Sequence, residues 1–138
     1  MRRKVAVSAL AVAVVFGMGV RANEKPTAEF QATMKSNGAT LGALRMHIMA
    51  KDYDGIATDA ATLKSNFAKI EAFWVQKKVD AAITFSKNGA KGAADLEAAA
   101  KAKDDAAITA ANMAVGGSCG GCHMAHREQL PDKSFEIK

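Results

Sequence analysis

The sequence predicts an all-α protein, an antiparallel up-and-down four-helix bundle. Apolar residues recur three or four positions apart in four successive segments, which is the spacing of one helix face. Alanine is very frequent, and the only prolines, Pro26 and Pro131, lie near the ends of residues 23–138. Because alanine loses no side-chain entropy in a helix and proline interrupts one, the interior is free to be helical. No sustained alternation of branched or aromatic residues marks a strand.

Residues 1–22 have the pattern of a secretory signal peptide. Three basic residues come near the start, an apolar or small run follows over residues 5–20, and Val20-Arg21-Ala22 is a small-x-small cleavage site. The run is shorter than the ~20 apolar residues of a membrane anchor, and no cysteine for lipid attachment lies near the cut. We therefore expect export to the periplasm, no stable membrane insertion after cleavage, and one mature domain over residues 23–138.

The charge of the mature chain removes the only support for a nucleic-acid partner. The full chain has a net charge of +5, but four of its nineteen basic residues lie within residues 1–22, which leaves fifteen against fourteen acidic residues. A nucleic-acid interface needs a clustered cationic face that displaces counterions from phosphates. The mature chain has no such excess of positive charge.

Apolar stripes predict the first two helices. The first stripe follows Pro26 and has a polar residue, Asn37, at one step; its apolar members are Phe30, Met34, Leu41, Leu44 and Ile48. Turn residues break it over residues 51–55. The second stripe then consists of Ile56, Ala60, Leu63, Phe67, Ile70 and Trp74.

The third helix is predicted from about residue 73 to residue 102, where the stripe passes through small residues. Gly89 and Gly92 lie inside it. Because a helical glycine costs about 1 kcal/mol relative to alanine, the pair predicts either a local break or a close approach by a bulky group.

The fourth helix is predicted to follow a short turn at residues 103–105, whose aspartates suit a helix start. It runs toward Leu130, where Pro131 ends it and leaves a short polar tail. Connections of two to five residues make neighbouring helices antiparallel, as in an up-and-down bundle.

The most specific motif in the chain is Cys119-Gly120-Gly121-Cys122-His123, on this last helix. The two thiols lie about one helical turn apart on one face, which suits addition to the two vinyl groups of haem, and His123 can present a ring nitrogen to the iron. The mature chain has no other cysteine. We therefore expect one covalently attached haem c, with its iron, in each chain.

Other uses of the two cysteines explain less of the motif and its surroundings. A thioredoxin-like pair begins a helix after a strand, and no strand is predicted before Cys119. A structural zinc site needs a fourth ligand, and neither His47 nor His126 has the usual spacing. A disulfide would not explain the adjacent histidine.

The second axial ligand of the iron must come from a facing helix. His126 lies three residues after His123 on the same helix, so it is on the same side of the macrocycle. The first helix offers four candidates: Met34, Met46, His47 and Met49. Met34 lies on the apolar stripe, while Met46 and His47 fall off it, although a methionine on the stripe can also be a flexible core filler. His47 is expected at the surface.

The chain resembles the class II cytochromes c, the family of cytochrome c′ and its low-spin relatives. The likeness rests on the attachment motif near the C-terminus, on Val115-Gly116-Gly117-Ser118 before it, and on Arg127 four residues after His123. The segment from Met34 to Asp54 is similar to the first helix and turn of the low-spin members. The resemblance implies that Met34 is the sixth iron ligand and that Arg127 contacts the cofactor.

The sequence departs from the family pattern in three places; the first leaves open how enclosed the haem is and whether a family-like homodimer forms, and the last weakens the case for a gas-binding site. The connection between the second and third helices, expected around residues 71–73, is short. His126 stands where the family usually has an aromatic residue. Phe30 stands where many cytochromes c′ have an arginine near the open iron position.

Two functions compete, and neither is enzymatic. A single-electron carrier that meets redox proteins in the periplasm would hold iron between His123 and Met34. A five-coordinate protein would instead bind nitric oxide or carbon monoxide on an open face. Peroxidase chemistry would need a distal acid–base group, for which His47 is a poor candidate because it lies off the stripe.

Overall fold

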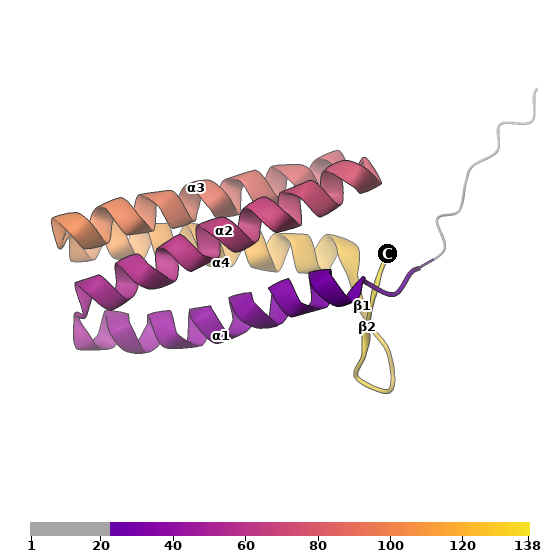
Figure 1. The fold of residues 1–138 in the computed structure, drawn as a ribbon, viewed down its shortest axis with the longest axis horizontal. Coiled ribbons are helices and arrows are strands. Elements are labelled where there is room, and N and C mark those ends of the chain that lie inside the picture. The colour runs from indigo at the N-terminus through magenta and orange to yellow at the C-terminus, as the bar shows by residue number, and fades with distance from the viewer. Residues whose placement is uncertain (1–22) are drawn as a thin grey trace, which may run out of the picture.

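The computed structural model describes residues 23–138, so the predicted signal peptide lies outside the described residues. Four long helices follow one another along the chain: α1 (Ala28–Ala50), α2 (Tyr53–Lys77), α3 (Asp80–Ala102) and α4 (Asp105–His126). They run antiparallel as an up-and-down bundle (Figure 1). The predicted all-α bundle of four helices is confirmed. None of the helices in this part of the chain is long and apolar enough to cross a membrane.

Each helix connection consists of two residues, the first of which is a lysine in the left-handed region. Lys51, Lys78 and Lys103 have φ values of 53°, 56° and 55°, and each donates its backbone N–H to carbonyls at the end of the preceding helix. Asp52 and Asp104 then cap the next helices by accepting hydrogen bonds from backbone N–H groups. Tight turns of this kind keep the four helices close and antiparallel.

The predicted boundary between the second and third helices is wrong. α2 continues to Lys77, and the connection is Lys78-Val79 rather than residues 71–73. Trp74 is still on the buried stripe of α2, with 2% of its surface exposed. Continuing the helix past residue 73 therefore keeps this large apolar side chain in the core. Val79 caps α3 without a side-chain hydrogen bond, and therefore no capping residue marks the start in the sequence.

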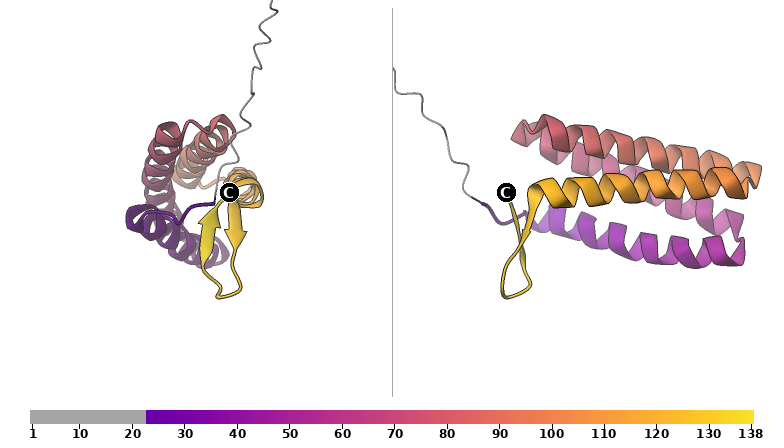
Figure 2. Two further views of the ribbon diagram at one scale, coloured as in Figure 1. Left: turned by 90° about the vertical axis from the view of Figure 1, so that its right-hand side faces the viewer. Right: turned by 180° about the vertical axis from the view of Figure 1, so that it is seen from behind.

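The polar tail after α4 forms a short hairpin, which corrects the expectation that the chain has no strands. α4 ends at His126 rather than near Leu130, and β1 (Arg127–Gln129) pairs antiparallel with β2 (Phe135–Ile137). Glu24 adds a bridge to Ile137, with N···O distances of 3.0 and 2.8 Å. The hairpin lies across the end of the bundle where α1 begins and α4 ends (Figure 1, Figure 2).

The core decides between the two explanations of the glycines in α3. The ring of Phe67 occupies the place that a Cβ of Gly89 would take, and Val115 of α4 packs against Gly92. Both glycines therefore allow side chains of neighbouring helices to approach the backbone of α3, and this helix is unbroken. The largest fully buried apolar side chains are Leu44, Ile56, Leu63, Leu96, Ile108 and Val115.

Helices that are neighbours in the chain pack closely, but α1 and α4 do not close the ring with comparable contact. Among the described residues, the close pairs are α1 with α2, α2 with α3, and α3 with α4. The seam between α1 and α4 is thus the place where a bulky group can enter the bundle.

Candidate functional site

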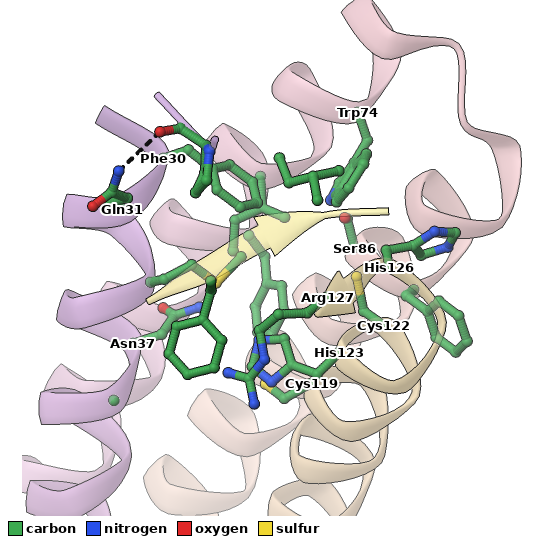
Figure 3. A pocket seen from close by; sticks show the side chains of 18 of the residues that line it. Phe30, Gln31, Asn37, Trp74, Ser86, Cys119, Cys122, His123, His126 and Arg127 are labelled. Carbon is green, nitrogen blue, oxygen red and sulfur yellow. Dashed lines mark hydrogen bonds between the residues drawn. The ribbon is translucent and has the colours of Figure 1, made fainter. Parts of the chain in front are cut away.

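A cavity of about 410 Å³ lies at the hairpin end of the bundle. Side chains from all four helices and from the hairpin line it (Figure 3). Most of the lining is apolar, including Phe30, Leu41, Phe67, Ile70, Phe85 and Ile137. The volume lies within the roughly 300–1,000 Å³ that small-molecule and cofactor sites occupy.

The sequence motif forms the α4 wall of this cavity. Cys119, Cys122 and His123 all line it, and Figure 3 shows them on neighbouring turns of one helix. Both thiols are free. Burial raises the pKa of Cys119, and burial followed by the nearby Cys119 raises the pKa of Cys122 to about 11. The thiols are therefore protonated near neutral pH in the folded chain.

His123 is held in its neutral form. Burial, and secondarily the positive charge of Arg127, lower its pKa. A neutral imidazole has a free nitrogen lone pair, which is what a metal ligand needs. Arg127 lies at the rim of the cavity, with its guanidinium carbon 4.3 Å from the centre of the Phe135 ring.

The α1 wall contains one of the four candidates for a second axial ligand. Met34 lines the cavity and packs against the core. Met46 and Met49 do not line it and are 60% and 64% exposed. His47 does not line it either; its Nδ1 is 2.8 Å from Oδ2 of Asp59. His47 is half-buried rather than fully at the surface.

A buried amide pair fixes the wall that carries Met34. Asn37, one turn further along α1, is 5% exposed and lines the cavity. Its side-chain oxygen accepts a hydrogen bond of 2.9 Å from Nδ2 of Asn66, which also donates to Oγ of Ser36 over 2.9 Å. The polar step in the first apolar stripe thus ties α1 to α2.

Comparison with known families matches residues 72–127 to the family described as Cytochrome C'. The matched segment contains α3, α4, both cysteines and His123. Over this segment the chain is similar to the class II cytochrome c family. The match begins after α1, so it does not extend to Met34. No curated protein matches the chain.

The match supports a c-type cytochrome, and the family implies covalently bound haem c with its iron. The lining of the cavity fits that group: two thiols one turn apart, a neutral imidazole beside them, and largely apolar walls for a flat macrocycle. A zinc site fits less well. Within residues 23–138, no group of three or more His, Cys, Asp or Glu side chains is placed to hold a metal ion.

Sequence reasoning missed several residues of the site. Trp74 and Phe85 line the cavity, but the sequence identified Trp74 only as part of a core stripe. His126 also lines the cavity, on the same helix as His123. Phe135 and Ile137 reach the cavity through the hairpin, and the Pro131-Asp132 pair is a turn signal that could have predicted this hairpin.

Proposed function

We propose that this cytochrome is an exported single-electron carrier whose haem iron is bound by His123 and Met34. One observation carries the proposal: of the four candidate ligands on α1, Met34 alone lines the cavity into which Cys119, Cys122 and His123 face. The two candidate ligands thus reach the cavity from two different helices, α1 and α4.

Histidine and methionine together suit electron transfer. Iron held by His123 and Met34 would have no open position for a substrate or gas, and methionine ligation would raise its reduction potential. The chain's own part is to keep His123 neutral, to exclude water with apolar walls and to hold α1 in place through Asn37 and Asn66. This proposal requires no acid–base catalysis.

Phe30 favours the carrier over a gas-binding protein. It lies in the cavity lining one turn before Met34, with its ring centre 4.1 Å from that of Phe73 and 5.8 Å from that of Trp74. The Phe30 side chain itself offers no cation or hydrogen-bond donor to a diatomic ligand on iron.

The proposed site of action is the periplasm, where residues 1–22 would direct the chain. Its proposed partners are other exported redox proteins that deliver or accept one electron. A homodimer like those of the family is left open by the short connection between the second and third helices. Nucleic acid is not a proposed partner, since the mature chain has nearly equal numbers of basic and acidic residues.

The test compares absorption spectra of the haem-loaded wild type, Met34→Leu and Met46→Leu, each reduced, with and without carbon monoxide. Met46 is the matched control because it lies on the same helix and is exposed. We expect wild type and Met46→Leu to be low-spin and unresponsive to the gas, and Met34→Leu to bind it. A reduced wild type that is high-spin and binds carbon monoxide at once contradicts the carrier and supports the five-coordinate alternative.

A further inference from the structure

Two buried polar atoms on the cavity lining have no hydrogen-bond partner. They are Nε1 of Trp74 and Nε2 of His126, the two such side-chain atoms found within residues 23–138. Trp74 comes from the end of α2 and His126 from the end of α4. Their ring centres lie 5.3 Å apart, at an interplanar angle of 47°, so the two groups can meet one ligand.

An unpartnered buried donor is costly, and folded proteins rarely contain one without a reason. Trp74 is held in place by aromatic contacts: its ring meets those of Phe30 and Phe73 edge to face, at 5.8 and 5.1 Å. The indole therefore cannot turn its N–H toward solvent without breaking this cluster. The missing partner is expected to be a group that enters the cavity.

The chemistry of the two atoms defines that group. An indole N–H only donates, so its partner must be an acceptor. Burial and the charge of Lys138 lower the pKa of His126 and favour its neutral ring, whose Nε2 can carry a proton and donate as well. A carboxylate offers two acceptor oxygens, one for each donor.

The surrounding charges also suit a carboxylate. Arg127 lies on the cavity lining and Lys138 acts on His126. Glu136 is the one acidic side chain in the lining, and it makes no hydrogen bond to either orphan atom. The protein thus places Arg127 and Lys138 near the two orphan atoms, but among the described residues no acceptor bonds either of them.

We propose that Trp74 and His126 form a carboxylate subsite that hydrogen-bonds a propionate of the haem. This inference rests on haem occupying the cavity, as the family implies. It gives a role to His126, which departs from the aromatic residue usual in the family, and it makes the hairpin end of the cavity the propionate end.

The test measures the propionate-bending band by resonance Raman spectroscopy in haem-loaded variants. Trp74→Phe keeps the aromatic packing and removes the donor, and His126→Leu removes the other. His126→Gln restores a side-chain N–H. The control is Gln31→Leu, because Gln31 also lines the cavity but its amide already donates to the carbonyl of Pro26 over 2.8 Å (Figure 3).

We expect the band to shift in Trp74→Phe and in His126→Leu, to shift less in His126→Gln, and to stay in place in Gln31→Leu. A band that is unchanged in both Trp74→Phe and His126→Leu overturns the inference and leaves buried water as the partner. Covalent haem content, measured on the same samples, separates the two proposals: a chain without haem contradicts the proposed function instead.

A second measurement needs no variant. The chain contains a single tryptophan, so nitrogen-15 labelling gives one indole N–H resonance in the haem-loaded wild type. That resonance should move as a carboxyl group is titrated with acid. If the resonance does not move while the carboxyl group is titrated, the proposed subsite is wrong, even if the variants fail to fold.

Discussion

The ring of Phe85 lies against the backbone of Gly121, between the two cysteines of the attachment motif. A Cβ built at Gly121 would sit 2.5 Å from Cε1 of Phe85, whereas one built at Gly120 meets nothing within 4 Å. Phe85 also lines the cavity. The second glycine of the motif therefore lets α3 approach α4 at the haem site, while the first faces open space.

This difference predicts opposite effects for two neighbouring substitutions. Gly121→Ala should destabilise the haem-loaded protein by about 1–3 kcal/mol, because the new methyl group overpacks against Phe85. Gly120→Ala should stabilise it by about 0.5–1 kcal/mol through helix propensity. Urea unfolding measures both free energies; equal effects would contradict the proposed packing.

Asn66 is expected to hold the Met34 wall. In Asn66→Ala, the buried oxygen of Asn37 loses its donor, and we expect a loss of about 1–3 kcal/mol in the free energy of unfolding. Ser65→Ala is the control, since the neighbouring Ser65 is exposed and surface changes stay within about 0.5 kcal/mol. If the haem-loaded Asn66→Ala and Ser65→Ala proteins have the same free energy of unfolding in urea, the amide pair does not tie α1 to α2.

The helices were predictable because each buries a stripe that repeats with the helical period. The boundary at Lys78 was not, because a left-handed lysine and an uncapped valine leave no glycine, proline or capping residue to detect. The hairpin strands are three residues long, too short for an alternating pattern.

The site was predictable where the spacing of residues within one helix indicates their function. Cys119, Cys122 and His123 form such a motif, and the stripe on α1 singled out Met34. Trp74 and Phe85 reach the cavity from α2 and α3, and only the packing of separate helices brings them there. A core stripe and a cavity wall look the same in a sequence until the tertiary arrangement is known.

The two cysteines give a chemical test of covalent attachment. In the haem-loaded protein, neither thiol should react with iodoacetamide, even after unfolding in urea, because both sulfurs are in thioethers. In a haem-free folded chain, Cys122 should react slowly near neutral pH and faster as the pH approaches its raised pKa of about 11. Mass spectrometry counts the added groups, and the haem-free chain unfolded in urea is the control. Alkylation of the unfolded haem-loaded protein would rule out thioether bonds.

The ion pairs of Glu97 predict a pH dependence of stability away from the haem site. Its carboxylate lies 2.7 Å from Nζ of Lys64 on α2 and 2.6 Å from Nζ of Lys101 on its own helix. Hydrogen bonds from Lys101 and then Lys64 lower its pKa from 4.5 to about 2. Because the folded pKa is the lower one, the stabilisation is fully present above the unfolded value and is lost as the pH falls through about 2.

We expect Glu97→Gln to lower the urea midpoint at pH 7, and we expect its midpoint to approach that of the wild type as the pH falls from about 4.5 toward 2. Asp95→Asn is the matched control, since Asp95 is on the same helix and pairs with the exposed Lys91 in the i, i+4 position. A gap between Glu97→Gln and wild type that stays constant over this pH range would show that the two lysines do not stabilise the charged form of Glu97.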